Sequence, residues 1–244
     1  MAEGPLAAFD AVLFDLDGVI TESATLHRAC WKEMFDEYLA RRAAESGSVF
    51  EPFTDEDYRR FVDGKLRYDG VRSFLEHRGI RLPEGDPQDP PDAETVCGLG
   101  NRKNSLVVAL LEERGIETFD DAVALIDGLR RRGIEMGVVS ASKNAGPMLA
   151  AAGLEGLFAV RVDGWVAAEL GLPGKPAPDT FLEGARRLGV PAERTVVVED
   201  AISGVQAGRA GGFGLVVGVD RTGDPEALAS GGADLVVDDL TVLL

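Results

Sequence analysis

The sequence predicts an α/β protein with a doubly wound, Rossmann-like parallel-sheet core and an inserted all-helical domain. From about residue 118 to the end, short apolar runs alternate with helical patterns, which is the signature of βαβ units. Residues 22 to about 114 instead show little β-branched alternation and several helical segments. We therefore expect a core of residues 1–21 and 115–244, with a helical domain of residues 22–114 inserted after the first strand.

Short apolar runs predict the strands of the core. Ala11–Phe14 is wholly apolar and is followed by turn residues, which is typical of a buried parallel strand. Met136–Val139 and Thr195–Val198 predict two further buried strands. Phe213–Val219 and Asp234–Val237 predict two more.

Helical patterns fill the rest of the chain. In the core, residues 121–132 and 178–188 carry apolar faces and are closed by Gly133 and Gly189. The inserted domain has an amphipathic first helix over residues 26–39. Its further helix candidates cover residues 55–61, 68–78 and 102–114, and the Pro-, Asp- and Gly-rich residues 82–93 predict a loop.

Composition narrows the possible partners. Lys and Arg total 25 against 42 Asp and Glu, giving a net charge of −17, which argues against nucleic acid and anionic membranes as partners. A phosphorylated substrate stays possible, because a few placed cations decide local binding. We find no apolar run long enough for a membrane span and expect no signal peptide at the start, Met1–Pro5. The two cysteines, Cys30 and Cys97, predict packing roles and a cytoplasmic protein.

Two carboxylates, Asp15 and Asp17, follow the first predicted strand directly. Open α/β sheets bind ligands at the carboxyl ends of their strands. One carboxylate there could attack a phosphorus atom while the other handles the proton. An isolated pair of this kind is more often a loop of solvated acids, so the other strand ends decide the interpretation.

Polar residues also follow the later strands. Ser140 begins a Ser-Ala-Ser-Lys-Asn loop, Lys175 precedes Pro176 just before a helical pattern, and Glu199 and Asp200 follow three valines. Together with the two aspartates these residues suit phosphoryl transfer: a nucleophile, a proton shuttle, a hydroxyl, a cation for phosphate, and carboxylates for Mg²⁺. Asp200 could instead cap the helix that follows it, and Ser140 could cap the helix that follows the Ser-Ala-Ser-Lys-Asn loop.

These motifs resemble those of the haloacid dehalogenase superfamily, in order and spacing over nearly the whole chain, and most of all those of its β-phosphoglucomutase-like subfamily. Asp15-Leu16-Asp17-Gly18-Val19 is similar to the first motif, Ser140 to the second, Lys175 to the third and Glu199-Asp200 to the fourth. The resemblance implies an aspartyl-phosphate on Asp15, acid–base catalysis by Asp17, and Mg²⁺ held by Asp15, Asp17, Glu199 and Asp200. The resemblance also implies that the inserted helical domain is the cap domain found in this family.

The resemblance also implies a substrate site. Ser23 matches a hinge residue of the subfamily, and His27 and Trp31 match two cap residues. Gly64 and Arg67 lie in a segment similar to the loop that holds a distal phosphate. Lys103 matches a cap lysine near the sugar. The implied substrate-binding set is His27, Trp31, Gly64, Arg67, Lys103, Ser142, Lys143 and Asn144. Gly70 departs from the pattern, which has a serine there, and residues 43–54 and 83–95 look lengthened.

The implied function is Mg²⁺-dependent conversion of β-glucose 1-phosphate to glucose 6-phosphate by a monomer acting on small phosphorylated sugars. The alternative within the superfamily is a sugar-phosphate phosphatase, in which water attacks the phosphoenzyme. A non-catalytic module that binds a metabolite is a third hypothesis, which the full set of catalytic groups disfavours.

Overall fold

The computed structural model describes residues 5–244, so most of the segment in which we expected no signal peptide lies outside the described residues. The chain divides into two compact units. The first holds the residues up to Glu22, Gly64–Leu66 and Ile116–Leu244, and the second holds Ser23–Asp63 and Arg67–Gly115. In the described part of the chain, no helix has the length and apolar character needed to cross a bilayer.

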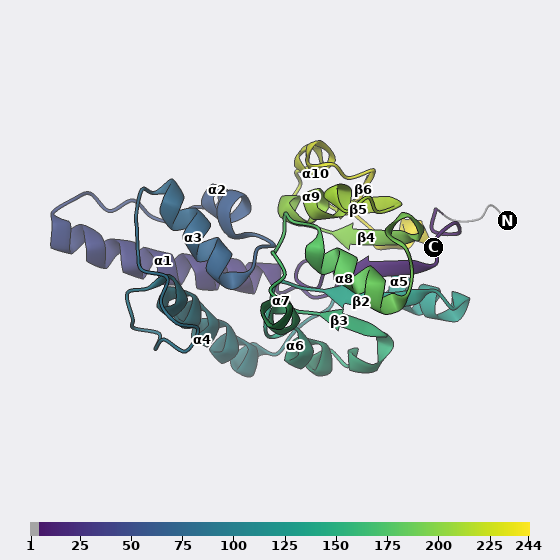
Figure 1. The fold of residues 1–244 in the computed structure, drawn as a ribbon, viewed down its shortest axis with the longest axis horizontal. Helices are drawn as coiled ribbons and strands as arrows, with labels where there is room; N and C mark the ends of the chain where they lie inside the picture. Colours follow the sequence, from purple (N-terminus) through teal and green to yellow (C-terminus); the bar gives the residue numbers. More distant parts are fainter. Residues whose placement is uncertain (1–4) are drawn as a thin grey trace. The chain divides into compact units, whose positions relative to one another are not determined.

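The first unit is built on a six-stranded parallel sheet (Figure 1). Its strands, in chain order, are β1 (Ala11–Phe14), β2 (Glu135–Val139), β3 (Val160–Val162), β4 (Thr195–Glu199), β5 (Leu215–Val219) and β6 (Leu235–Val237). Their spatial order is β3-β2-β1-β4-β5-β6. The chain therefore adds β2 and β3 on one side of β1 and then β4, β5 and β6 on the other side. This confirms the predicted doubly wound α/β class.

Strand β1 lies at the centre because it is apolar at every position. All four of its residues are fully buried, as expected for a strand covered on both faces. Phe14 stands opposite Val138 of β2 and Val198 of β4, so the three central strands end at nearly the same level. The residues that follow them therefore come together at one edge of the sheet.

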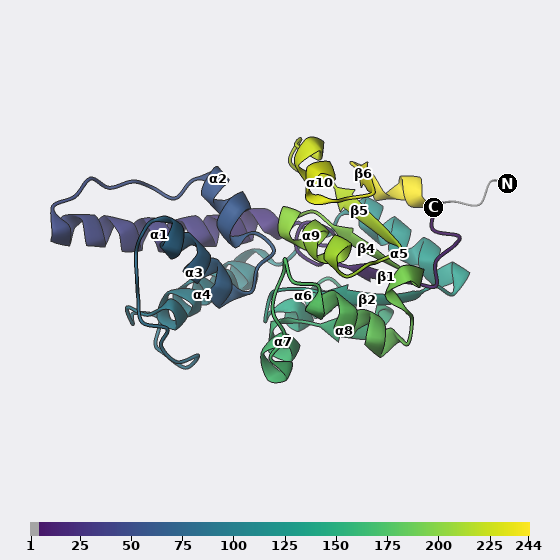
Figure 2. The same cartoon turned by 45° about the horizontal axis from the view of Figure 1, so that its top comes forward.

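Helices cover both faces of this sheet. They are α5 (Asp120–Arg132), α6 (Ala145–Ala151), α7 (Gly164–Leu170), α8 (Asp179–Leu188), α9 (Ile202–Ala210) and α10 (Pro225–Gly231), with short 3₁₀ turns η2 (Glu155–Leu157), η3 (Ala192–Arg194) and η4 (Leu240–Leu243). Helices α8 and α9 lie on one face and α5 on the other (Figure 2). This follows from right-handed crossovers, since the chain runs outward through β2 and β3 and then returns across the sheet.

The predicted helix ends in this unit are confirmed. Gly133 and Gly189 end α5 and α8 in the left-handed conformation, with φ of 69° and 71°. Strand β3 and helix α7 were not predicted, because each is short and the exposed Arg161 interrupts the apolar pattern of β3. Strand β5 begins at Leu215, two residues inside the predicted run from 213.

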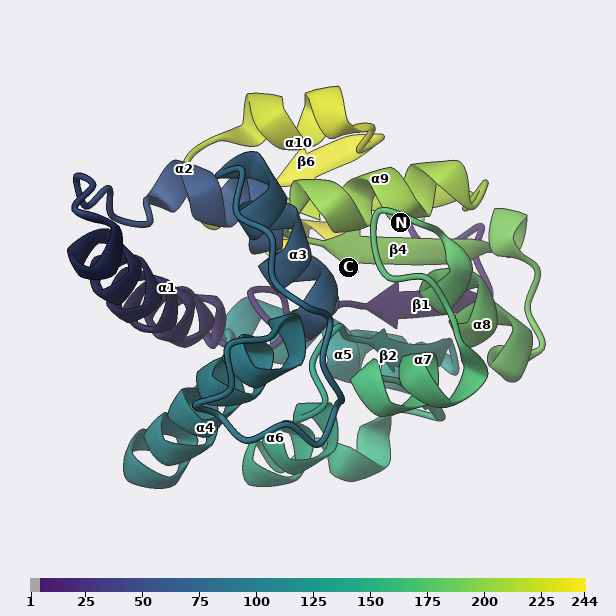
Figure 3. The same ribbon diagram turned by 60° about the vertical axis from the view of Figure 1, so that its left-hand side comes forward.

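The second unit is helical (Figure 3). It contains α1 (Ala24–Ser46), α2 (Asp55–Asp57), the π-helical turn η1 (Tyr58–Val62), α3 (Arg67–His77) and α4 (Val96–Arg114). Helix α4 packs against α1 and α3, and the core between the helices is rich in aromatic rings: Phe35 lies 4.3 Å from Phe74 and 5.0 Å from Phe53 between ring centroids. Residues 82–93 form a loop, as predicted.

Helix α4 is longer than the sequence predicted. It begins at Val96 rather than near residue 102, because the Thr95 hydroxyl accepts a hydrogen bond from the Gly98 amide at 2.9 Å and caps the helix there. Gly98 and Gly100 concealed this start, since glycine disfavours helix interiors. At Gly100 the reason for glycine is packing: a Cβ would lie 2.7 Å from the Tyr68 ring.

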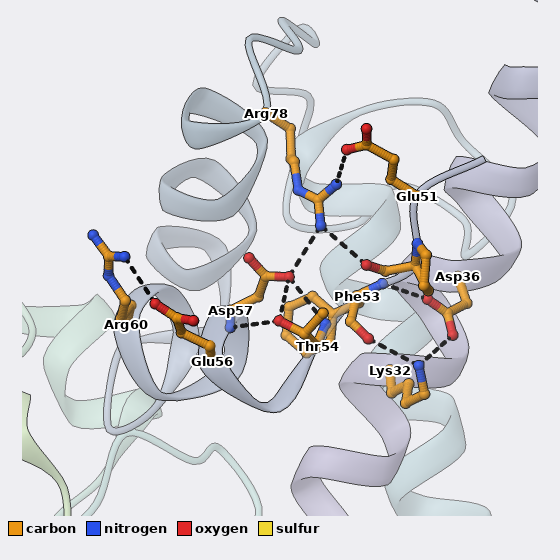
Figure 4. A network of polar contacts seen from close by, with 10 residues as sticks. Lys32, Asp36, Glu51, Phe53, Thr54, Glu56, Asp57, Arg60 and Arg78 are labelled. Atoms are coloured by element: carbon orange, nitrogen blue, oxygen red, sulfur yellow. Dashed lines mark hydrogen bonds and ion pairs between the residues drawn. The ribbon is translucent and has the colours of Figure 1, made fainter. Parts of the chain in front are cut away.

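A buried carboxylate links the start of α2 to the residue that follows α3 (Figure 4). Asp57 accepts hydrogen bonds from the Thr54 amide at 2.9 Å, the Thr54 hydroxyl at 2.8 Å and the Arg78 guanidinium at 3.0 Å. Its own amide donates to the Thr54 hydroxyl, which completes a capping box. Burial alone would raise the pKa of Asp57, but the bonds from Thr54 and Arg78 outweigh burial and lower it.

We expect Asp57→Ala to destabilise the protein by about 1–3 kcal/mol, because it leaves the Arg78 guanidinium and the Thr54 groups without their acceptor. Since the pKa of Asp57 is lowered on folding, its stabilisation is complete above its ordinary value of 3.8 and is lost as the pH falls below it. Urea denaturation at pH 7 and in acid measures both effects. The control is Glu56→Ala one residue earlier, where the exposed pair with Arg60 contributes about 0–1 kcal/mol. Equal losses in the two variants would contradict a special role for Asp57.

Candidate active site

A buried lysine stands between two carboxylates at the carboxyl end of the sheet. The Lys175 ammonium donates to Asp15 Oδ1 and to Glu199 Oε1, each at 2.5 Å, and to the Val139 carbonyl at 3.3 Å. Lys175, Asp15 and Glu199 are 3%, 5% and 0% exposed. The sequence predicted that these three residues share a site, and the structure brings them into direct contact.

Each member of this cluster is held by its element. Asp15 directly follows β1, Glu199 ends β4, and Lys175 lies in the loop before α8, where its ammonium stands 4.9 Å from the centre of the Phe181 ring. The second oxygen of Glu199, Oε2, accepts from the Ala201 amide at 2.8 Å. A Cβ on Gly204 would lie 1.8 Å from Glu199 Oε1, so glycine is needed there.

Charge inside the cluster is unbalanced, with two carboxylates for one ammonium. Burial would lower the pKa of Lys175, but the charges of Asp15 and Glu199 outweigh burial and raise it, so the ammonium stays protonated. Burial raises the pKa of Asp15 well above its ordinary value, and Lys175 offsets only part of this. A further positive charge at this position would favour the ionised form of Asp15.

The other predicted catalytic and metal-binding residues lie on neighbouring loops of the same unit. The Ser140 hydroxyl donates to Asp17 Oδ2 at 3.3 Å and accepts from the Ser142 amide at 3.0 Å. Gly18 has a φ of 91°, and a Cβ there would lie 1.9 Å from Asp200 Oδ2. The carboxylate of Asp200 therefore packs against the loop that carries Asp15 and Asp17.

Two capping hypotheses are wrong. Helix α9 begins after Ala201 and has no side-chain cap, so Asp200 does not cap it. Helix α6 begins after Asn144, also without a side-chain cap, so Ser140 is not a helix cap either. Ser140 instead donates to Asp17, and the Asp200 carboxylate packs against Gly18.

The predicted substrate-binding residues 142–144 lie against the start of α7. Ser142 Oγ accepts from the Asn144 amide at 3.1 Å, and the Ser142 carbonyl accepts from the Gly164 amide at 3.1 Å. The Lys143 ammonium stands 4.5 Å from the centre of the Trp165 ring. Trp165 was not predicted as part of the site, and no local pattern in the sequence pairs it with Lys143.

Gly64–Leu66 belong to the first unit, although Asp63 before them and Arg67 after them belong to the second. A Cβ on Gly64 would lie 2.4 Å from Ser203 Oγ and 3.2 Å from the Ala201 side chain. Gly64 also has a φ of 68°, so both its backbone conformation and its surroundings require glycine. This predicted site residue therefore lies beside the segment that follows Glu199 and Asp200.

The predicted residues of the second unit form a cluster of their own. The Lys103 ammonium lies 2.6 Å from His27 Nδ1 and 5.0 Å from the centre of the Trp31 ring, and both His27 and Lys103 are buried. Because an ammonium only donates, Nδ1 accepts and the proton of the neutral ring is on Nε2. The Arg67 guanidinium donates to Asn104 Oδ1 at 2.6 Å, and burial lowers its pKa.

Comparison with known proteins bears on this geometry. Residues 9–212 match the family model of the haloacid dehalogenase-like hydrolases. A protein of Mycobacterium bovis (strain ATCC BAA-935 / AF2122/97) named β-phosphoglucomutase is 50% identical over 238 residues, covering 96% of this chain and 91% of that protein. The β-phosphoglucomutase of Bacillus subtilis (strain 168) is 31% identical and covers 96% of this chain and 92% of its own length.

Solved structures show the same fold. The crystal structure of β-phosphoglucomutase from Clostridium difficile superposes with a TM-score of 0.75 at 26% sequence identity. The match covers 97% of this chain and 93% of that one.

Proposed function

Because the chain belongs to the haloacid dehalogenase-like hydrolase family, it is a phosphotransferase or hydrolase, and we propose that it converts β-glucose 1-phosphate to glucose 6-phosphate through an aspartyl-phosphate on Asp15. The observation that carries the proposal is the buried Lys175 ammonium beside Asp15 at the carboxyl end of the sheet. The mycobacterial relative named β-phosphoglucomutase supports the substrate.

In this proposal Asp15 is the nucleophile that accepts the phosphoryl group, and Lys175 is the cation that donates a hydrogen bond to an oxygen of that group. An ionised carboxylate needs no base to activate it, and Lys175 favours that ionised form. The same ammonium can donate to a phosphate oxygen without moving far. Glu199 keeps Lys175 protonated and fixed in place through its own bond at 2.5 Å.

Asp17 is proposed as the general acid and base. It protonates the leaving group when Asp15 is phosphorylated and removes the proton from the attacking sugar hydroxyl in the reverse transfer. The bond from the Ser140 hydroxyl, at 3.3 Å, orients the Asp17 carboxylate. The two acids are two residues apart on one loop, so one can attack phosphorus while the other serves the oxygen that leaves.

Mg²⁺ fits this site by the chemistry of its donors, since it prefers carboxylate oxygens. Among residues 5–244, no three His, Cys, Asp or Glu side chains converge on one point. Asp15, Asp17 and Asp200 nevertheless lie on adjoining loops, and the buried cluster is short of positive charge. These three would hold the ion, and Glu199 can join them because each carboxylate oxygen has two lone pairs. Bound there, Mg²⁺ would offset the repulsion between Asp15 and the phosphate.

The second unit is proposed as the cap domain that binds the sugar. Arg67 would hold the non-reacting phosphate, because a mutase must bind a second phosphate away from the nucleophile. In the first unit, Ser142, Lys143 and Asn144 are proposed as substrate-binding residues, and Lys143 supplies a cation for a phosphate that does not react. His27 and Lys103 would hydrogen-bond sugar hydroxyls beside the Trp31 ring. A plain phosphatase would gain little from this second cationic set.

The two free, buried thiols, Cys30 and Cys97, suit a reducing compartment, so we propose that the enzyme acts in the cytoplasm. We further propose that it works as a monomer on small phosphorylated sugars. Sedimentation analysis of the purified protein would test the monomer.

One experiment tests the proposed reaction. The protein is incubated with β-glucose 1-phosphate, a trace of glucose 1,6-bisphosphate and Mg²⁺, and glucose 6-phosphate and free phosphate are both measured. We expect glucose 6-phosphate to form well in excess of free phosphate. Release of phosphate alone would replace the mutase with a sugar-phosphate phosphatase. No turnover of any small phosphate ester would favour a binding module.

Gly18→Ala should lower kcat/KM for p-nitrophenyl phosphate roughly a hundredfold, because its Cβ would overlap the Asp200 carboxylate and displace the loop of Asp15 and Asp17. The control is Gly133→Ala, which has a similarly positive φ of 69° but nothing within 4 Å of its Cβ. That variant should lose stability and keep its activity. Equal activities in the two variants would mean that Asp200 need not be fixed.

A further inference from the structure

Two consecutive residues of α7, Gly164 and Trp165, pack against the side chain of Lys143. Its ammonium lies over the indole of Trp165, 4.5 Å from the ring centre. Its aliphatic stem passes Gly164, where a Cβ would lie 2.9 Å from Lys143 Cγ and 3.1 Å from the Lys143 amide. Only glycine permits this approach, so Gly164 supports the stem of Lys143 and Trp165 supports its charge.

Hydrogen bonds fix the start of α7, which carries these two residues. The buried Asp163 carboxylate caps α7, accepting from the Trp165 amide at 3.0 Å and the Val166 amide at 3.1 Å, and its other oxygen accepts from Arg161 Nε at 2.9 Å. The Gly164 amide donates to the Ser142 carbonyl. The helix that carries Trp165 is thereby bonded to the loop that carries Lys143. This bond keeps the indole ring next to the Lys143 ammonium.

Packing does not explain the indole. Trp165 is 62% exposed, so most of its surface gains nothing from burial, and it lies outside the described hydrophobic core. A lysine on a flexible stem loses considerable side-chain entropy when it binds an anion, and a cation–π contact that holds it beforehand reduces that loss. The exposed ring therefore has a role through the lysine that it contacts.

We propose that Trp165 is a positioning residue that holds the Lys143 ammonium ready for the non-reacting phosphate of the substrate. This inference rests on the proposed function, which gives Lys143 that phosphate. Trp165 acts through Lys143 and needs no contact with the reacting atoms. Its effect should therefore fall on the affinity for a bisphosphorylated sugar and spare turnover of a small aryl phosphate, whose single phosphate belongs beside Lys175.

The test measures binding of glucose 1,6-bisphosphate by calorimetry, in an Asp15→Asn background that prevents turnover. Trp165→Leu, which keeps apolar bulk and removes the aromatic face, should raise the Kd roughly two- to fivefold. Trp165→Phe keeps a weaker aromatic face, so its Kd should lie between that of the protein with Trp165 and that of Trp165→Leu. In a Lys143→Met background, Trp165→Leu should have no further effect, because the interaction is already gone. In the chain with Asp15 intact, kcat for p-nitrophenyl phosphate should be unchanged by Trp165→Leu.

A second readout is independent of ligand. In the NMR spectrum the ε-methylene protons of Lys143 should be shifted upfield by the Trp165 ring current, and Trp165→Leu should remove that shift. An unchanged Kd in Trp165→Leu, or an equal further loss in the Lys143→Met background, would overturn the inference. If the wild type releases only phosphate from β-glucose 1-phosphate but Trp165→Leu still weakens bisphosphate binding, the proposed mutase fails and the positioning role stands. If glucose 6-phosphate forms but the Kd is insensitive to Trp165, the mutase stands and the positioning role fails.

Discussion

Asp15→Asn is expected to lower phosphoryl transfer by a factor on the order of 10⁴ or more, with the fold intact. An amide cannot form the acyl phosphate, so the step through which every turnover passes is lost. The stability at pH 7 should stay equal or rise, because the raised pKa of Asp15 means that its ionised form is disfavoured in the folded state. Turnover of p-nitrophenyl phosphate and thermal unfolding measure the two effects.

The matched control is Asp10→Asn, near the other end of the same strand. Asp10 is exposed and pairs with Arg194 at 2.7 Å on the surface, so its loss should change activity little. A phosphoenzyme trapped with ³²P-labelled substrate in the wild type and missing in Asp15→Asn would support the nucleophile directly. More than trace activity in Asp15→Asn, with no phosphoenzyme in either protein, would remove that assignment.

The sheet and the polar residues at its carboxyl edge could be predicted because they depend on local signals. An apolar run such as Ala11–Phe14, followed by turn residues, favours a buried parallel strand, and the polar residues that directly follow such a strand lie at the carboxyl edge of the sheet. Asp15, Ser140 and Glu199 were placed correctly on those grounds. Helix ends at Gly133 and Gly189 were readable for a similar reason, since glycine there supplies the left-handed conformation.

The contacts within the site depend on tertiary distances and were not readable. Glu199 was predicted only as a metal ligand, yet it also bonds Lys175, which is 24 residues away in the chain. Trp165 meets Lys143 through a short helix that has too few residues to show a period. The early start of α4 was concealed by Gly100, whose reason is the Tyr68 ring packed against it. In each case the deciding partner lies on another element.

Lys175→Met should have the second large effect, on stability as well as on activity. It leaves Asp15 and Glu199 buried together without a positive charge, and breaking a buried ion pair from one side costs about 3–5 kcal/mol. Activity should also fall sharply, since the proposed phosphate ligand is gone. Urea denaturation at pH 7, in EDTA so that no divalent ion replaces the ammonium, measures the loss of stability.

The pH dependence identifies the cause of that loss. Without Lys175 nothing offsets burial, so the pKa of Asp15, already raised in the wild type, should rise further. A carboxylate with a raised pKa binds its proton more tightly in the folded state, so the variant should regain stability as the pH falls from 7 towards 5, before ordinary acid unfolding begins. Adding Glu199→Gln to Lys175→Met should restore part of the stability at pH 7 for the same reason. Lys32→Met, which removes a half-exposed ammonium paired with Asp36, should cost only about 0–1 kcal/mol and show no such pH dependence. A loss in Lys175→Met that is constant with pH and unaffected by Glu199→Gln would point to lost packing against Phe181 rather than to uncompensated charge.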